Sequence, residues 1–431
     1  MRKKDVKIGL IGFGTVGTGV VRLVKSYQDD LLKQTGTTIQ IERILVKDPL
    51  KNRPLSVEGK RLTTDPTAIL DDPNIDIIIE VMGGIEPAKS YIQRALEKGK
   101  HVVTANKDLM ALHGDELLHL AEASGCDLYY EASVAGGVPI LKTITDGFSS
   151  DRITKMIGIV NGTTNYILTK MSRENVPFER ALEEAQSFGY AEQDPSSDVD
   201  GLDAARKMAI LASLGFHTGM NVDDVTCKGI RNITVDDLAY GKQLGYTMKL
   251  VGIAKRDERG IEVGVEPTFV KDTHPLAAVN GVYNAIYVYG EAVGETMFYG
   301  PGAGELPTAT AVLSDLVTVV KNIQLGITGK NKSHTYTEKI LKEDGDIYAN
   351  FFLRLIVQDK CGVLAKLADW MAKEEISLEK VFQKPYATDK NEAELILVTH
   401  SASKKSIEQL LSKLKQSDLI HEIKSCFRVE G

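Results

Sequence analysis

The segment KIGLIGFGTVG (7–17) constrains the fold more than any other part of the sequence. Its apolar run, Val6–Ile11, predicts a buried strand, and helical periodicity follows over Thr15–Asp29. In such a strand–turn–helix unit the glycines let a pyrophosphate approach the turn, and the helix N-terminus attracts its negative charge. A purely structural glycine turn is the alternative interpretation. The preferred prediction is a dinucleotide-binding turn formed by Gly12, Phe13, Gly14, Thr15, Val16 and Gly17.

Strand-like and helix-like segments alternate through the rest of the N-terminal part. A helical pattern covers Ala88–Lys98. The strand-like runs are Ile39–Val46, Ile75–Val81, His101–Ala105 and Leu128–Glu131. Such alternation predicts a Rossmann-type α/β domain with a parallel sheet and helices on both faces.

The pattern changes after about residue 150. Residues 247–300 are rich in β-branched residues and tyrosine, which predicts sheet, and residues 327–349 are polar and punctuated by glycine, which suits a linker. Residues 350–431 outline a βαββαβ unit. We therefore expect a dinucleotide-binding domain (1–135, completed by a helix at 305–325), an α+β catalytic and dimerisation domain with a mixed sheet (136–330), a linker (331–349) and a ferredoxin-like domain (350–431).

Bulk properties narrow the classes of partner. A chain of 431 residues predicts two or three domains. The formal charge of −7 disfavours nucleic acid and anionic membranes as main partners, and no apolar stretch approaches the length that spans a bilayer. Four scattered cysteines without a CxxC pair predict reduced thiols, hence a cytoplasmic protein without a zinc site.

Two further features bear on a nucleotide site. In VKDPLKNRP, Asp48 can accept a ribose hydroxyl, whereas Lys47, Lys51 and Arg53 can hold a 2′-phosphate, which favours NADP slightly over NAD. Lys107, in TANKDLM, follows a predicted strand end, the edge at which open α/β sheets bind ligands. A solvated loop charge is the alternative for Lys107.

The stretch GYAEQDPSSDVDGLDAARK (189–207) concentrates five carboxylates before Arg206 and Lys207. Asp203 and Lys207 lie four positions apart, so on a helix starting near Gly201 they share one face. Spacing alone leaves two interpretations open. One is an acidic helix entrance with a surface ion pair, and the other is a prepared site with a desolvated lysine.

The same stretch resembles the signature of the homoserine dehydrogenase family. The resemblance rests on fixed spacings among Ala185, Gly189, Tyr190, Ala191, Asp194, Pro195, Asp198, Val199, Gly201, Asp203 and Lys207. It extends over the whole chain through TANK, EASVAGGVP (131–139), NGTTNYIL (161–168), GPGAG (300–304) and a C-terminal part similar to an ACT domain. Together these are similar to the bacterial three-domain form of the enzyme.

The resemblance implies an activity. It implies hydride transfer between NADP(H) or NAD(H) and the L-homoserine/L-aspartate 4-semialdehyde pair, a step in the biosynthesis of threonine, methionine and isoleucine. Lys207 would be the proton donor and acceptor, Asp203 would contact substrate and orient the lysine, and Lys107 would reach both cofactor and substrate.

The resemblance also implies binding residues. Glu192 would bind the substrate ammonium, and Asp198 and Tyr190 would belong to the same pocket. The NGTTN turn can bind the α-carboxylate through backbone N–H groups and the Thr163 hydroxyl. Gly189, Gly302 and Gly304 would contact the cofactor. A sodium ion would take oxygen ligands from Glu131, Val134, Gly136 and Val138, although a tight turn explains the same glycines.

The ACT-like part implies feedback inhibition by threonine and self-association as a homodimer or homotetramer, and a dimerisation module without ligand is the alternative. Many such domains carry proline where this chain has Cys361. Two other functions stay open: another semialdehyde or hydroxy-acid dehydrogenase, and a non-catalytic amino-acid sensor. An acyl-enzyme mechanism would need an activated cysteine, and Cys126 is better interpreted as structural.

Overall fold

The computed structural model describes residues 5–57, 61–330, 335, 337–387 and 391–431. It divides into two compact units. The first unit comprises Met1–Met156, Ala204–Val225 and Tyr283–Glu338, and the second comprises Ile157–Asp203, Thr226–Val282 and Lys339–Gly431. Across the described residues, no helix is long and apolar enough to cross a membrane.

A six-stranded parallel sheet forms the centre of the first unit, in the order β3-β2-β1-β4-β5-β6. Its strands are β1 (Asp5–Ile11), β2 (Thr38–Leu45), β3 (Leu62–Thr63), β4 (Ile77–Glu80), β5 (His101–Thr104) and β6 (Leu128–Tyr129). Its helices are α1 (Thr15–Ser26), α2 (Gln28–Thr35), α3 (Thr67–Leu70), α4 (Ala88–Glu97), α5 (Lys107–Ala123) and α11 (Glu305–Leu325). This strand order is that of the dinucleotide-binding Rossmann fold.

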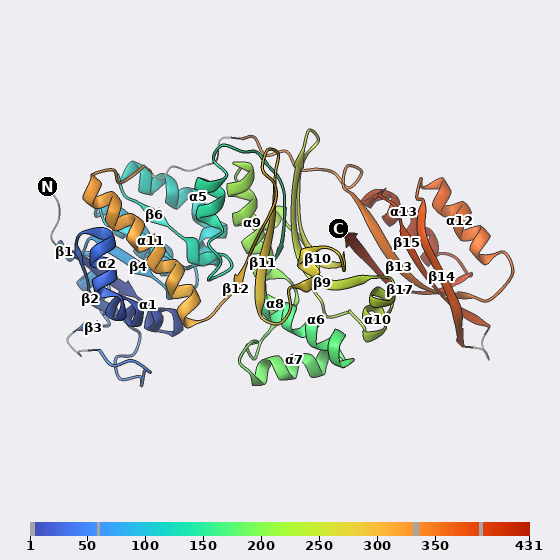
Figure 1. Ribbon diagram of the computed structural model, residues 1–431, viewed down its shortest axis with the longest axis horizontal. Coiled ribbons are helices and arrows are strands. Elements are labelled where there is room, and N and C mark those ends of the chain that lie inside the picture. The colour runs from blue at the N-terminus through green and yellow to red at the C-terminus, as the bar shows by residue number, and fades with distance from the viewer. Residues whose placement is uncertain (1–4, 58–60, 331–334, 336, 388–390) are drawn as a thin grey trace. The chain divides into compact units, whose positions relative to one another are not determined.

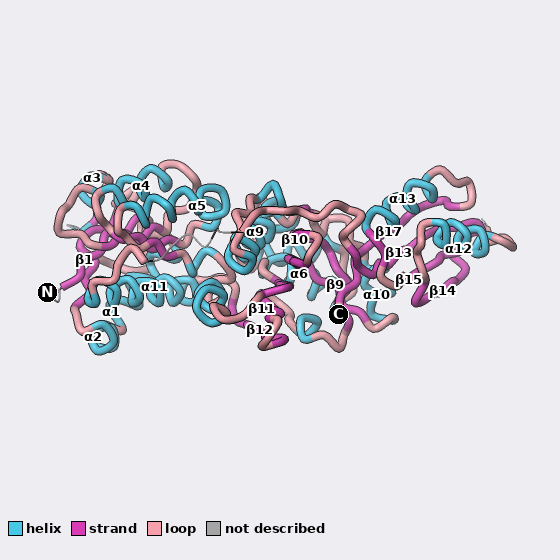
Figure 2. The backbone as a smooth tube through the Cα atoms, turned by 90° about the horizontal axis from the view of Figure 1, so that it is seen from above, coloured by secondary structure: helices cyan, strands magenta, loops and turns pink. Residues whose placement is uncertain are grey.

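Helices cover both faces of this sheet, as the alternating sequence pattern predicts. Figure 2 shows α1, α2 and α11 on one side of the strands and α3, α4 and α5 on the other. In Figure 1, α11 runs alongside α1 although the two are almost 300 residues apart in the chain. A Cβ at Gly19 of α1 would meet Ala309 at 2.9 Å, so glycine permits this close packing. The apolar faces of α1 and α11 share one core with β1, β2 and β4.

The remaining elements of the first unit are short. They are η2 (Glu131–Ser133), η3 (Thr143–Gly147), η4 (Val222–Asp224) and the antiparallel hairpin β11 (Tyr283–Gly290) and β12 (Gly294–Pro301). Two elements, β7 (Ile153–Ile159) and α9 (Leu202–Phe216), contribute residues to both units. Two predicted boundaries differ from the structure. The strand predicted over Leu128–Glu131 ends at Tyr129, and the helix predicted over residues 15–29 is divided at Tyr27 into α1 and α2.

The second unit contains a mixed sheet, as predicted. Its path is β9-β10-β17-β13-β15-β14, in which β10 pairs antiparallel with β9 but parallel with β8 and β17. The elements before residue 280 are α6 (Gly162–Glu174), α7 (Phe178–Ser187), α8 (Ser196–Val199), β8 (Thr226–Cys227), α10 (Val235–Gln243), β9 (Tyr246–Asp257), β10 (Gly260–Lys271) and η5 (Pro275–Ala278).

The C-terminal module, from Tyr348 onward, has the predicted βαββαβ order (Figure 1, red end). Its elements are β13 (Tyr348–Gln358), α12 (Val363–Lys373), β14 (Leu378–Ala387), β15 (Glu392–Thr399), β16 (Ala402–Ser403), α13 (Lys404–Lys415) and β17 (Ile420–Glu430). The antiparallel order β17-β13-β15-β14 is ferredoxin-like. Alternate residues of β13, such as Leu353 and Leu355, pack against α12 and α13, whereas Phe352 and Arg354 face α10 and β10.

Candidate active site

The glycine turn after β1 has the geometry that a dinucleotide needs. Gly12 has φ +104°, and a Cβ there would lie 2.8 Å from the Val81 carbonyl oxygen. A Cβ at Gly17 would collide with the Gly12 carbonyl, whereas nothing crowds Gly14. Because α1 begins at Thr15 without a side-chain cap, its first N–H groups suit a phosphate.

Lys107 stands at the carboxyl edge of the same sheet. It is the first residue of α5, directly after β5 and the N-cap Asn106, and it is half-buried. The Asn106 side chain accepts a hydrogen bond from Leu109 N and donates one to Gly84 O at 2.6 Å. Lys107 therefore extends from a rigid strand–helix junction.

Two glycine turns far apart in the sequence pack together in the first unit. Gly137 N donates to Pro301 O at 3.0 Å, and a Cβ at Gly136 would collide with the Gly302 carbonyl. A Cβ at Gly302 would in turn overlap the side chain of Asn284, whose buried amide finds no hydrogen-bond partner among the described residues. Gly304, with φ +127°, precedes α11. The close packing that these glycines allow fits the cofactor contacts predicted for Gly302 and Gly304. The position of Asn284 against Gly302 was not predicted from the sequence.

The predicted sodium loop is held by a buried carboxylate. Glu131 accepts hydrogen bonds from Leu141 N (2.9 Å) and Lys142 N (2.7 Å), and its own N–H donates to Asp315 Oδ2. Burial raises the pKa of Glu131, and burial together with the Glu131 charge raises the pKa of Asp315. The Val138 carbonyl accepts from Ile140 N. The Glu131 carbonyl likewise accepts from Val134 N, so two of the four oxygens predicted to bind sodium already take part in backbone hydrogen bonds.

The acidic stretch 189–207 separates into an exposed and a buried part. Asp194 accepts a hydrogen bond from Ser196 N, and Asp200 pairs with Arg231 at 2.5 Å, both at the surface. Asp203 and Lys207 lie one turn apart on α9 and are only 3% and 9% exposed. The interpretation as a surface ion pair is therefore wrong, because both residues are buried.

One residue outside the acidic stretch brings two of its carboxylates together. Asn161 Nδ2 donates to Asp198 Oδ1 at 2.7 Å and to Asp203 Oδ2 at 2.8 Å. Asn161 ends the connection from β7 and caps α6. Sequence reasoning did not predict this contact, since the residues are 37 and 42 positions apart.

The other predicted substrate residues lie around the start of α6. The Thr163 hydroxyl donates to the Tyr190 carbonyl at 2.6 Å, so its single proton is already used. Tyr190 is part of an aromatic trio with Tyr166 and Phe188. Glu192 and Gly189 lie on the exposed part of the loop, where Gln186 donates to the Glu192 carbonyl.

Cys126 does not offer an activated thiol. Burial raises the pKa of Cys126 to about 11, and its sulfur contacts backbone carbonyls of Leu96 and Ser124. In the part of the chain that the structure describes, no three His, Cys, Asp or Glu side chains gather as a metal site would require. The raised pKa of Cys126 disfavours an acyl-enzyme mechanism through this thiol.

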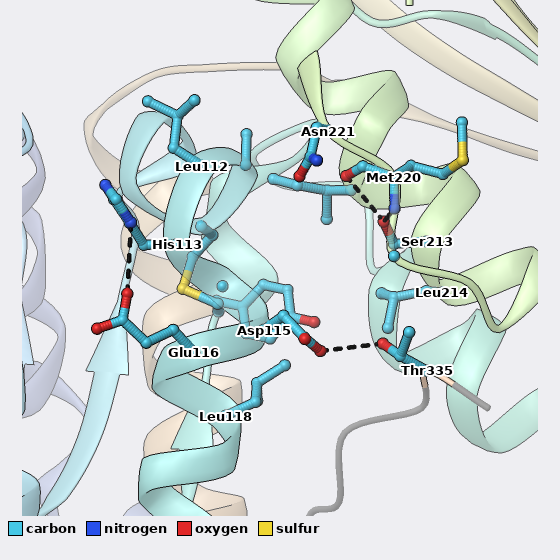
Figure 3. A pocket seen from close by; sticks show the side chains of 16 residues that line it. Leu112, His113, Asp115, Glu116, Leu118, Ser213, Leu214, Met220, Asn221 and Thr335 are labelled. Carbon is cyan, nitrogen blue, oxygen red and sulfur yellow. Dashed lines mark hydrogen bonds and ion pairs between the residues drawn. The ribbon is translucent and has the colours of Figure 1, made fainter. Parts of the chain in front are cut away.

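A separate pocket of about 280 Å³ lies between α5 and α9 in the first unit (Figure 3). Met110, Leu118 and Leu214 supply apolar walls, and Asp115 accepts a hydrogen bond from Thr335 at 3.1 Å. None of the predicted catalytic, substrate or cofactor residues lines it.

The strand order, the glycine turn and the lysine at the carboxyl edge define the class. The chain has a dinucleotide-binding Rossmann domain with a lysine at the edge where such sheets bind their ligands. Two family models match the chain: "Homoserine dehydrogenase, NAD binding domain" over residues 12–131 and "Homoserine dehydrogenase" over residues 139–317.

Known relatives cover the whole chain. The homoserine dehydrogenase of Bacillus subtilis is 53% identical over 99% of both chains, and that of Lactococcus lactis is 40% identical over 99% of both. A homoserine dehydrogenase structure from Thiobacillus denitrificans has a TM-score of 0.95 at 36% identity, covering 100% of this chain and 99% of that one. A hyperthermophilic archaeal homoserine dehydrogenase in complex with NADPH has a TM-score of 0.62 at 27% identity, covering 73% of this chain and 97% of that one.

The chain belongs to the homoserine dehydrogenase family. It is an NAD(P)-dependent oxidoreductase that acts on homoserine and aspartate semialdehyde. The alternatives of a different dehydrogenase and of a non-catalytic sensor are excluded.

Proposed function

We propose that Lys207 carries the proton when this enzyme interconverts L-homoserine and L-aspartate 4-semialdehyde. The observation that carries the proposal is the burial of Lys207 and Asp203, one helical turn apart on α9. A buried lysine is unusual without a role or partner, and a buried carboxylate on the same helical face can orient it.

The chemistry follows from these residue types. When bound, the nicotinamide supplies hydride to the aldehyde carbon or accepts it from the alcohol. In reduction, the Lys207 ammonium donates a proton to the oxygen that becomes the hydroxyl, and in oxidation the neutral amine accepts it. Asp203 keeps the amine directed at the reacting oxygen, and Lys107 contacts substrate and cofactor.

Substrate recognition uses charge complementarity. Glu192 and Asp198 accept hydrogen bonds from the α-ammonium, with Tyr190 in the same pocket. The Thr163 proton is used on the Tyr190 carbonyl, so the backbone N–H groups at the start of α6 are the donors for the α-carboxylate. Thr163 thus shapes the pocket through Tyr190.

The cofactor site combines the first glycine turn with Lys107, Gly189, Gly302 and Gly304. A preference for NADP is supported by Arg53, whose guanidinium lies 5.5 Å from the Phe13 ring centroid beside the glycine turn. The archaeal relative's complex with NADPH supports the same preference. Backbone oxygens of Glu131, Val134, Gly136 and Val138 hold a sodium ion that stiffens the loop facing Gly302.

The C-terminal module is a regulatory ACT domain that takes threonine as its effector, and the cytoplasmic enzyme is a homodimer or homotetramer. The βαββαβ order with its ferredoxin-like sheet supports the first assignment. The helix start at Gly362, with φ +92°, follows Cys361 directly. The turn that requires glycine is therefore kept at Gly362, although Cys361 stands where many such domains have proline.

The test is reduction of NADP by homoserine, followed by absorbance, with wild type and Lys207→Ala. We expect kcat to fall by about 10²–10⁴-fold, because a positioned acid–base group contributes that much. The affinity for NADP, measured by fluorescence quenching, should stay unchanged. Lys228→Ala, which removes an exposed lysine, is the matched control. A kcat for Lys207→Ala within threefold of wild type would contradict the assignment.

A further inference from the structure

Asn161 occupies the junction between β7 and α6 and is 5% exposed. Its Oδ1 accepts hydrogen bonds from Thr164 N at 2.8 Å and from the Thr164 hydroxyl at 2.9 Å. Its Nδ2 donates to Asp198 at 2.7 Å and to Asp203 at 2.8 Å. The Asn161 side chain therefore caps the N-terminus of α6 with its oxygen and donates its two amide protons to two carboxylates.

Chemistry fixes the orientation of this amide. A backbone N–H can only donate, so the oxygen of Asn161 must face Thr164, and the NH₂ group must face the carboxylates. The start of α6 is fixed as well, since a Cβ at Gly162 would lie 2.8 Å from the Val282 carbonyl oxygen. The donor group is thus held on rigid backbone.

Two carboxylates that approach a common point repel each other, and one of them tends to take up a proton. Donors shared between them favour the ionised form of both. Among the neighbouring charges, Asp200 pairs with Arg231, Asp194 accepts from Ser196, and Lys249 donates to Asn165 on α6, whereas Lys207 shares the face of α9 on which Asp203 lies. Asp198 and Asp203 are the pair that Asn161 bridges.

We infer that Asn161 is a positioning residue that keeps Asp198 and Asp203 ionised and at a fixed separation for catalysis. The inference rests on the proposed roles of those two carboxylates. Asn161 acts through them and binds neither substrate nor cofactor. Serine, threonine and aspartate also cap helices well, but of these four residues only asparagine offers one acceptor and two donors.

Two substitutions separate the cap from the bridge. Asn161→Ser keeps a capping oxygen but loses the two donors, and Asn161→Asp keeps shape and cap but faces the carboxylates with an acceptor. We expect kcat/KM for homoserine to fall on the order of 10- to 100-fold in Asn161→Ser and further in Asn161→Asp. Affinity for NADP should not change. Ser403→Ala, which removes the N-cap of α13, is the control for loss of a cap and should leave kcat/KM unchanged.

The decisive readout is the pH profile of kcat/KM. Without the donors the carboxylates protonate more easily, so the acidic limb should move to higher pH in both variants. A merely structural role would lower stability without moving that limb. If Asn161→Ser is too unstable to assay, Asn161→Asp alone decides. A wild-type acidic limb in the assayable variants would overturn the inference.

Asp203→Asn and the double variant Asn161→Ser/Asp203→Asn separate this inference from the proposed function. If Asn161 acts through Asp203, the double variant should lose little more than Asp203→Asn alone. Losses that are additive in this double variant and also in Asn161→Ser/Asp198→Asn would overturn the inference while leaving the role of Asp203 standing. Wild-type activity in Asp203→Asn would overturn the proposed role of Asp203, and the inference with it.

Discussion

At the scale of single residues, Lys249 is a buried amine held by neutral oxygens. It lies on β9, is 1% exposed, and donates to Asn165 Oδ1 at 3.1 Å, to Asn280 Oδ1 at 3.3 Å and to the Val279 carbonyl. Burial, with a smaller contribution from the charge of Arg173, lowers its pKa to about 7. The amine thus ties β9 to α6, the helix that Asn161 caps.

The lowered pKa of Lys249 predicts that the protein becomes more stable as the pH rises above 7. Between pH 7 and about 10 the unfolded chain holds a proton that the folded chain has released, so stability rises with pH by up to about 1.4 kcal/mol per unit. Lys249→Met should remove that slope, whatever its effect on absolute stability. Urea unfolding at pH 7, 8 and 9 measures the slope, and Lys33→Met, at an exposed lysine, is the control. An unchanged slope in Lys249→Met would contradict the assignment.

Spacing predicts part of the site and misses the part that depends on tertiary contacts. The helical period is local, so four-residue spacing correctly predicted that Asp203 and Lys207 share α9. Burial is not local, so the same spacing equally allowed a surface pair. The role of Asn161 could not be predicted from the sequence, because asparagine is common in turns and the two carboxylates that it contacts are distant in the chain.

At the scale of elements, the helix α10 is fastened to strand β13 by one buried arginine. Arg354, 4% exposed, bonds Glu394 at 2.6 Å within the C-terminal module and reaches Asp237 (3.2 Å) and Asp236 (2.9 Å) on α10. Although burial alone would raise it, hydrogen bonds from Tyr240 and Arg354 lower the pKa of Glu394. Glu394 is therefore stabilised as a carboxylate although it is buried.

Arg354→Met should destabilise the protein by about 3–5 kcal/mol, because it leaves the buried carboxylate of Asp237 without its cation. Lys373→Met, which breaks an exposed i,i+4 pair with Asp369 in the same module, should cost less than about 1 kcal/mol. Chemical denaturation of both variants checks the difference. Equal losses of stability in the two variants would mean that Arg354 contributes no more than an exposed ion pair does.

Helices and strands with a strong hydrophobic period were predicted from the sequence, whereas features that depend on tertiary packing were not. Five of the six parallel strands of the first unit are buried runs rich in apolar residues, and their predicted positions were confirmed to within two residues, whereas the two-residue strand β3 was not predicted. The break at Tyr27 was missed because neither glycine nor proline marks it. Helix α10 has an acidic first turn in which Asp237 closes a capping box with Thr234, and the additional contact with Arg354 is too distant in the chain to be predicted from the sequence.

At the scale of the whole molecule, the C-terminal module is built into the second unit. Residues Thr268–Val270 of β10 pair in parallel with Arg428–Glu430 of β17. The buried Arg428 forms ion pairs with Glu262 and Glu266 of β10 and with Glu430, and Phe269 packs on Phe352 and Phe427. The module therefore completes the sheet and neutralises charges of β10.

Removing the module should consequently do more than relieve the feedback inhibition that we propose for it. A chain ending at residue 345 strips β17 and β13 from the sheet, removes Arg428 and Arg354 from Glu262 and Asp237, and uncovers the apolar side chain of Phe269. We expect its melting temperature to fall by roughly 10 °C or more, with homoserine oxidation falling too. Thermal melts and threonine titrations of both chains check this. A truncated enzyme that keeps its melting temperature and turnover, and loses only threonine sensitivity, would show instead that the module is a separable regulator.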